Sequence, residues 1–130
     1  MFETFDTRAV HAGREDFGEL GVHAPPLDLS TTYPLRDLNR ATASLDAFAA
    51  GAGSAPDAIY GRLFNPTVAR FERALATLEQ TETSVAFGSG MAAITAVLLD
   101  ARARGGDAGA HVVAVRPMYG GTDHLLSSGL

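Results

Sequence analysis

The chain has 130 residues, of which 46% are apolar and 19% are charged, so it is long and apolar enough to fold as one domain. Its formal net charge of −5 argues against nucleic acid or an anionic membrane surface as a partner. Without cysteine it has no disulfide, thiolate metal site or cysteine nucleophile. All 10 basic residues are arginine, so a mechanism that needs a lysine amine cannot be completed by these residues alone.

Residues 1–58 are predicted to form an arm or cover with no core of their own. They hold four of the 6 prolines, and Pro25-Pro26 and Tyr33-Pro34 favour an extended backbone. One short helix is predicted over residues 41–50. No run approaches the ~20 apolar residues of a membrane helix, and the acidic N-terminus is unlike a signal peptide, so a cytoplasmic location is expected. Because the last segment stops without a cap, we expect the chain to be the front portion of a longer protein.

Residues 59–130 show a more regular pattern. Asn65-Pro66 predicts a helix start, because asparagine caps helices and proline fits the first turn. Apolar residues then recur at helical spacing over 68–78. The segments that follow are a strand over 83–87, a turn over 88–90, a buried helix over 91–101, a polar loop over 102–109 and a strand over 111–115. This order predicts a βαβ unit in an α/β fold with buried parallel strands.

The turn at Gly88-Ser89-Gly90-Met91 is the first candidate site. Glycines permit a sharp turn and a close approach of a ligand to the backbone. The free amides and dipole of the helix that follows suit a phosphate, to which the Ser89 hydroxyl adds a donor. Many α/β proteins use such a turn only for its geometry. Neither the P-loop pattern nor the full dinucleotide fingerprint is present.

Three aromatic and charged residues are further candidates. Tyr60 and Arg62, spaced i, i+2 on an extended segment, would point the same way, and arginine suits phosphate. Tyr119 follows the second predicted strand at its carboxyl end, where open α/β sheets hold ligands, and can stack on a ring or pass a proton. Taken singly, each also fits a purely structural role, as does His124. The histidines show no metal-ligand spacing, so no metal site is predicted.

Four stretches together are more specific than any one of them. They are YGRLFNPT (60–67), LATLE (75–79), SGMAAI (89–94) and YGGT (119–122). In this order they resemble the cystathionine γ-synthase/γ-lyase and methionine γ-lyase family of pyridoxal-phosphate (PLP) enzymes, and TRAVHAG (7–13) and PPL (25–27) fit its opening arm. The resemblance implies that residues 59–130 begin the PLP-binding large domain of the aspartate aminotransferase-like fold type I, and that arm 1–58 contacts a neighbouring subunit of a dimer of dimers.

The resemblance also implies roles for particular residues. Ser89, Gly90 and Met91 would bind the cofactor phosphate. Tyr60 and Arg62 would bind the phosphate that belongs to the neighbouring subunit. Tyr119 would stack on the pyridine ring and protonate a γ leaving group. The family's Schiff-base lysine lies beyond residue 130, and so do the acid that pairs with the pyridine nitrogen and the arginine that grips the substrate carboxylate.

The implied activity is γ-elimination on a sulfur amino acid, cystathionine or methionine, giving 2-oxobutanoate, ammonia and a thiol. Gly121 stands where methionine γ-lyases typically carry cysteine, which favours the cystathionine or sulfhydrylase types or an atypical methionine lyase. Asp28 and Phe64 also depart from the family pattern. The alternatives are a γ-replacement enzyme (cystathionine γ-synthase or O-acylhomoserine sulfhydrylase), a non-catalytic phosphate-binding or oligomerisation module, and a plain nucleotide-binding domain.

Overall fold

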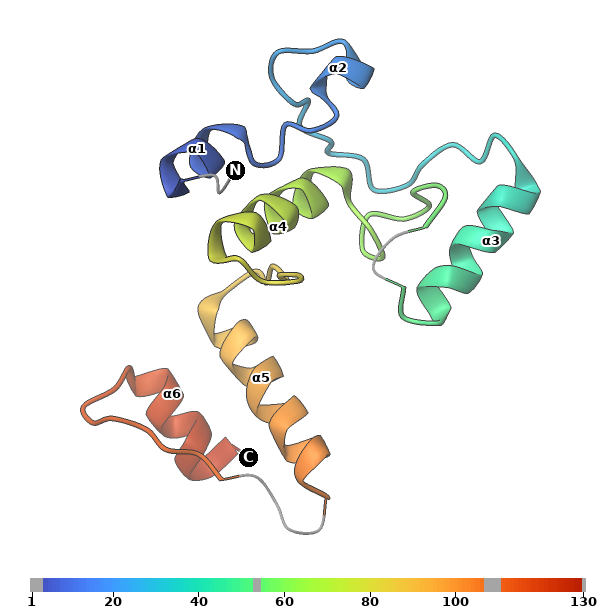
Figure 1. The fold of residues 1–130 in the computed structure, drawn as a ribbon. Helices are drawn as coiled ribbons and strands as arrows, with labels where there is room; N and C mark the ends of the chain where they lie inside the picture. The colour runs from blue at the N-terminus through green and yellow to red at the C-terminus, as the bar shows by residue number, and fades with distance from the viewer. Residues whose placement is uncertain (1–3, 53–54, 107–110, 130) are drawn as a thin grey trace. The chain divides into compact units, whose positions relative to one another are not determined.

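The computed structural model describes residues 4–52, 55–106 and 111–129, and these residues are mainly helical (Figure 1). The elements are α1 (Phe5–His11), α2 (Phe17–Leu20), α3 (Leu38–Ala49), α4 (Pro66–Glu79), α5 (Gly90–Gly105), α6 (Gly120–His124) and a π-helical turn, η2 (Leu125–Gly129). The chain divides into two compact units. We call Met1–Val85 the N-terminal unit and Ala86–Leu130 the C-terminal unit. The predicted boundary at residue 58 concerns contact with another subunit and stays a prediction.

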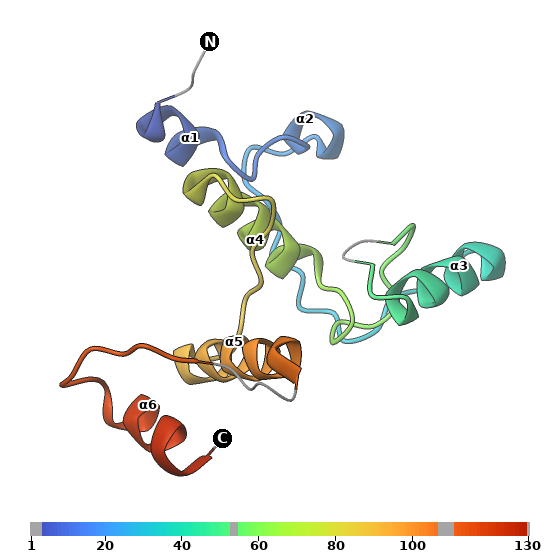
Figure 2. The ribbon, with the colours of Figure 1, turned by 60° about the horizontal axis from the view of Figure 1, so that its bottom comes forward.

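Helix α4 begins where the sequence predicts. The Asn65 Oδ1 atom accepts hydrogen bonds from the amides of Thr67 and Val68 at 2.9 and 3.1 Å, and Pro66 occupies the first turn. The helix ends at Glu79, followed by Gln80 in the left-handed region with φ 56°. Helix α1 contacts α4, and Figures 1 and 2 both show the two helices side by side.

The region before residue 58 holds more helix than the sequence predicts. Helix α3 begins at Leu38 instead of residue 41, because the Asp37 carboxylate caps the amides of Asn39 and Arg40 at 2.8 and 3.0 Å. Helix α1 follows Thr4, whose hydroxyl accepts from the Thr7 amide. Between them, residues 22–30 carry no regular secondary structure, as the proline pair predicts.

The two predicted strands are not strands in the described part of the chain. Residues 83–87 and 111–115 carry no regular secondary structure, and the β-pairing that the structure shows is one isolated antiparallel bridge between Thr32 and Tyr60. A strand is stable only when a neighbouring strand accepts its backbone hydrogen bonds. Val113 and Val115, predicted to be buried, are 90% and 85% exposed. The predicted βαβ unit therefore does not form among the described residues, and the complete α/β fold stays a prediction.

Helix α5 is longer and more exposed than predicted. It continues to Gly105, so residues 102–105 of the predicted loop are helical, while 107–109 lie outside the described residues. An ion pair between Arg104 and Asp100, one turn apart at 2.7 Å, supports the added turn. None of the residues of α5 is buried, and Val97 is 68% exposed, because the short helix α6 covers little of its surface. None of the described helices combines the length and apolarity that crossing a membrane requires.

Candidate functional site

The start of helix α5 presents two backbone amides. Ser89 caps the helix: its Oγ accepts from the Ala92 amide and its carbonyl accepts from the Ala93 amide, both at 3.2 Å. The first four amides of a helix lack partners inside it, so the amides of Gly90 and Met91 remain. Accepting a hydrogen bond also leaves the Ser89 hydroxyl hydrogen able to donate. Three donors therefore gather at the positive end of the 16-residue helix.

The space in front of these donors is open. A Cβ atom built on Gly88 or on Gly90 would meet no heavy atom within 4 Å, and residues 87–90 are all exposed. The two glycines therefore leave room for an anion to come close to the backbone of this turn. A phosphate ester fits this turn, because it accepts several hydrogen bonds and its charge is opposite to that of the helix end.

Tyr119 lies on a segment that reaches back to this turn. It is the residue before α6, and its carbonyl accepts from the amides of Thr122 and Asp123 at 2.9 and 3.0 Å. The Thr122 hydroxyl donates to the Met91 Sδ atom at 3.6 Å, which joins α6 to the start of α5. The structure thus brings the predicted phosphate turn and the segment that carries Tyr119 together within the C-terminal unit. Tyr119 is 72% exposed among the described residues, so its side chain is accessible to a ligand.

An ion pair spans the loop around Tyr119. The Arg116 guanidinium contacts the Asp123 carboxylate at 2.8 Å, with both side chains well exposed. Asp123 lies in the first turn of α6, where a carboxylate interacts favourably with the positive end of a helix. The pairing with Arg116 was not predicted, because it requires the intervening loop to fold back.

Tyr60 and Arg62 lie side by side, although the backbone differs from the expectation. The predicted extended segment is a turn, because the Tyr60 carbonyl accepts from the amides of Leu63 and Phe64 at 2.9 and 3.1 Å. The Arg62 Cζ atom lies 5.2 Å from the centre of the Tyr60 ring. Both residues belong to the N-terminal unit, and their predicted contact with the cofactor phosphate of a neighbouring subunit stays a prediction.

Backbone hydrogen bonds join the arm to the segment that carries Tyr60. The Gly61 amide donates to the Thr31 carbonyl at 2.8 Å, and the Tyr33 amide donates to the Ile59 carbonyl at 3.1 Å. A Cβ atom on Gly61 would lie 2.9 Å from the Ser30 carbonyl oxygen, so the two backbones are in close contact. The arm therefore holds the backbone that carries the Tyr60 and Arg62 side chains.

The two unusual residues near this segment have structural roles. The Asp28 amide donates to the Thr67 hydroxyl at 2.8 Å, and the Asn65 side-chain amide donates to the Asp28 carbonyl at 3.1 Å. The Ser30 amide, hydrogen-bonded to the Asp28 carboxylate, holds the pKa of that carboxyl below its ordinary value. Phe64 stacks on Phe48 of α3, with ring centres 6.0 Å apart. Asp28 thus joins the arm to the start of α4.

Arg70 is a second link between the arm and α4, and it was not predicted from the sequence. Its guanidinium forms a two-pronged ion pair with Asp16 and donates to the Gly13 carbonyl at 2.7 Å. This bonding holds the pKa of Asp16 below its ordinary value. The Arg70 Cζ atom also lies 5.4 Å from the centre of the Phe17 ring. The partners are 54 residues apart in sequence, so no local pattern indicates them.

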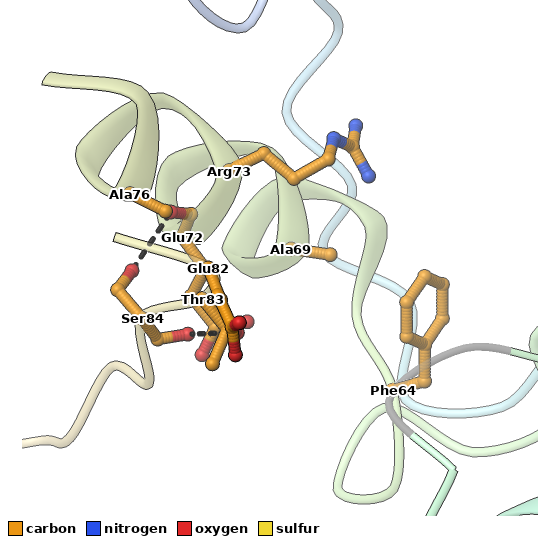
Figure 3. Close-up of a pocket in the computed structure, with 8 residues that line it drawn as sticks. All are labelled: Phe64, Ala69, Glu72, Arg73, Ala76, Glu82, Thr83 and Ser84. Atoms are coloured by element: carbon orange, nitrogen blue, oxygen red, sulfur yellow. Dashed lines mark hydrogen bonds between the residues drawn. The ribbon is translucent and has the colours of Figure 1, made fainter. Parts of the chain in front are cut away.

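A cavity of about 350 Å³ lies elsewhere in the N-terminal unit, beside α4 (Figure 3). The Ser84 hydroxyl donates to the Glu72 carbonyl at 2.7 Å at its wall. It is lined by Phe64, Ala69, Glu72, Arg73, Ala76, Glu82, Thr83 and Ser84. None of the predicted site residues lines this cavity, so it is not part of the candidate cofactor site.

Sequence comparison defines the class of protein to which this site belongs. The family described as Cys/Met metabolism PLP-dependent enzyme matches residues 6–130, and the chain belongs to this family. The predicted family and its PLP cofactor are thereby confirmed.

The similar proteins within this family include two lyases and a sulfhydrylase. The chain is 61% identical over 126 residues to an L-methionine gamma-lyase of Streptomyces avermitilis, covering 96% of the chain and 30% of the relative. It is 50% identical over 127 residues to an L-methionine gamma-lyase of Brevibacterium aurantiacum, with the same two coverages of 96% and 30%. It is 38% identical over 121 residues to an O-succinylhomoserine sulfhydrylase of Pseudomonas aeruginosa, covering 93% and 27%. The chain thus spans less than a third of the length of these curated relatives.

Proposed function

We propose that the protein containing these residues is a PLP-dependent carbon–sulfur lyase that acts on L-methionine and consumes one water, releasing 2-oxobutanoate, ammonia and a thiol. The observation that carries the proposal is the open turn before α5, whose free amides face unfilled space while Tyr119 lies on the adjoining segment. The names of the relatives at 61% and 50% identity favour methionine among the sulfur amino acids.

Each site residue has a definite task in this proposal. The amides of Gly90 and Met91 and the hydroxyl of Ser89 bind the cofactor phosphate. Tyr60 and Arg62 of a neighbouring subunit complete its shell. When bound, PLP supplies an electron sink for the negative charge that develops at the substrate α-carbon. The Tyr119 ring packs against the pyridine ring, and its Oη atom gives a proton to the departing sulfur. The lysine amine that this chemistry requires must come from outside the 130 residues, which contain none.

The activity is tested on the full-length, PLP-loaded protein. With L-methionine as the sole substrate, we expect 2-oxobutanoate and ammonia to appear in equal amounts together with a volatile thiol. PLP binding without any turnover would instead support a non-catalytic phosphate-binding module. Failure to bind PLP would contradict the family assignment of the site.

The second candidate is γ-replacement on an O-acylhomoserine. It is favoured by the sulfhydrylase relative at 38% identity and by Gly121, which stands where methionine γ-lyases typically carry cysteine. Offering O-succinylhomoserine with sulfide distinguishes the two functions. A higher kcat/KM for homocysteine formation than for methionine breakdown would establish replacement as the main reaction.

A shared site is tested by subunit complementation. Arg62→Ala and Tyr119→Phe are each expected to lower activity strongly. If residue 62 serves the site that contains residue 119 of another subunit, co-expressing the two variants creates mixed dimers with one intact site. Random assembly then restores about one quarter of the wild-type sites, because half of the dimers are mixed and each keeps one of two sites. No recovery in verified mixed dimers would place both residues in the same subunit's site.

A further inference from the structure

Asp28 bonds through its backbone to one part of the N-terminal unit and through its side chain to another. Its amide and its carbonyl bond to Thr67 and Asn65 at the start of α4. Its carboxylate instead accepts a hydrogen bond from the Ser30 amide at 2.8 Å, two residues further along the arm. Losing one of the two backbone bonds leaves the other, so residue 28 stays beside α4. The carboxylate closes the turn that follows and so sets the direction of the next residues.

The residues after this turn are in close contact with the segment that carries Tyr60. A Cβ atom on Gly61 would lie 2.9 Å from the Ser30 carbonyl oxygen and 3.5 Å from the Thr31 carbonyl oxygen. The Thr31 carbonyl accepts from the Gly61 amide at 2.8 Å, and Thr32 forms the antiparallel bridge with Tyr60. Because the two backbones touch, a change in the direction of the turn would also move the segment opposite it.

We propose that Asp28 is a positioning residue for the Tyr60 and Arg62 side chains. The turn that its carboxylate closes sets where these side chains are presented, with the Arg62 Cζ atom 5.2 Å from the centre of the Tyr60 ring. This inference rests on the proposed function, in which both side chains bind the cofactor phosphate of a neighbouring subunit. It adds a residue that controls the two phosphate donors without touching the cofactor.

Asp37 provides a matched control in the same unit. Its carboxylate also accepts from the amide two residues later, that of Asn39, at 2.8 Å. Asp37→Ala therefore removes the same charge and the same kind of bond as Asp28→Ala, but the bonds it loses lie at the start of α3. Asp28→Asn is the conservative variant, because an asparagine oxygen still accepts from the Ser30 amide.

The test measures cofactor affinity in the full-length protein, for PLP and for pyridoxal, which lacks the phosphate. Asp28→Ala is expected to weaken PLP binding about fivefold, a part of the roughly tenfold loss expected when Arg62→Ala removes a bond to a charged phosphate. Pyridoxal affinity should stay close to that of wild type, because the two donors have no phosphate to bind. Asp28→Asn and Asp37→Ala should leave both affinities nearly unchanged. Equal losses for PLP and pyridoxal, or equal losses in Asp28→Ala and Asp37→Ala, would overturn the proposal.

A further variant separates the charge of Asp28 from its geometry. Asp28→Glu keeps the charge but moves the accepting oxygen by one methylene, so it should weaken PLP binding as Asp28→Ala does. It also serves as the test if Asp28→Ala does not fold. Wild-type PLP affinity in a folded Asp28→Glu protein would show that the charge matters and the turn does not, and would overturn the proposal.

A background without the two donors separates this inference from the proposed function. In a Tyr60→Phe, Arg62→Ala double variant, Asp28→Ala should cause little further loss of PLP affinity. An undiminished further loss would show that Asp28 acts by another route, and would overturn the inference alone. If the double variant itself binds PLP as tightly as wild type, the role of Tyr60 and Arg62 in the proposed function fails instead.

Discussion

The contacts inside the N-terminal unit differ from those inside the C-terminal unit. The N-terminal unit is tied by polar groups that are far apart in sequence: Arg70 with Asp16, and Arg40 with Asp57. The ion pairs of the C-terminal unit, Arg104 with Asp100 and Arg116 with Asp123, join residues that are close in sequence. Its longest helix, α5, has no buried residue.

Because of this difference, the two units position their candidate site residues in different ways. In the N-terminal unit, the arm fixes the Tyr60 segment through backbone hydrogen bonds that span the unit. In the C-terminal unit, a local helix cap forms the proposed phosphate turn, while none of the residues of α5 is buried and residues 111–115 stay exposed. The turn that we propose to bind the cofactor phosphate is thus formed by local contacts alone, whereas the apolar surfaces beside it are left uncovered by the described residues.

The largest effect is expected when the 130 residues are produced alone. Val97, Val113 and Val115 are 68%, 90% and 85% exposed, and unpaired segments of this composition promote association. We expect size-exclusion chromatography to show aggregates or a broad, concentration-dependent distribution, and calorimetry to show no cooperative transition. A sharp monomer peak with a cooperative melt would contradict the idea that the C-terminal unit needs cover.

The next largest effect is expected from Tyr119→Phe in the full-length protein. Removing one positioned proton donor costs about 10²-fold or more in kcat, while the remaining ring still stacks on the cofactor. PLP affinity should therefore change little. Tyr33→Phe, which removes a phenol hydroxyl from the N-terminal unit, is the control and should keep kcat within twofold or so of wild type. Equal kcat values for the two variants would show that the Tyr119 hydroxyl is not the proton donor.

Local chemistry explains which elements the sequence predicts. Asn65-Pro66 marks the start of α4 because the capping atoms and the helix lie within a few residues of each other. Ser89 and the glycines beside it form the open turn for the same reason. The same signal could have predicted the starts of α1 and α3, because Thr4 and Asp37 are the capping residues that precede them.

Contacts between distant residues explain what the sequence does not predict. Apolar runs at 83–87 and 111–115 are typical of buried strands, but a strand also requires a partner, and none of the described residues supplies one. The Arg70–Asp16 pair and the Arg116–Asp123 pair depend on how the chain folds back. Neither leaves a periodic pattern in the sequence.

Removing one helix cap from each unit sharpens the comparison. Asn65→Ala and Ser89→Ala should each destabilise the protein by about 1 kcal/mol, measured by denaturant unfolding, because each loses an N-cap. Only Ser89→Ala should also weaken PLP binding, by about tenfold, because it removes a hydroxyl donor to a charged phosphate. Asn65→Asp keeps the cap and loses the bond to the Asp28 carbonyl, so it should fall between wild type and Asn65→Ala in stability. Equal PLP affinities for the three variants would show that the Ser89 hydroxyl does not bind the cofactor phosphate.

The smallest expected effect concerns the link between the arm and α4. Arg70→Ala should speed hydrogen exchange in residues 5–20 at pH 7, because it removes the ion pair with Asp16 and the bond to the Gly13 carbonyl. Arg70 lowers the folded-state pKa of Asp16 below the ordinary 3.8, so the contribution of the pair is present above that pH and is lost as the pH falls through the lowered value. The difference between Arg70→Ala and wild type should therefore shrink at acidic pH without vanishing, since the bond to Gly13 does not titrate. Asp16→Asn at pH 7 should resemble the acidified wild type, and a difference that stays constant with pH would show that Asp16 contributes nothing to holding the arm.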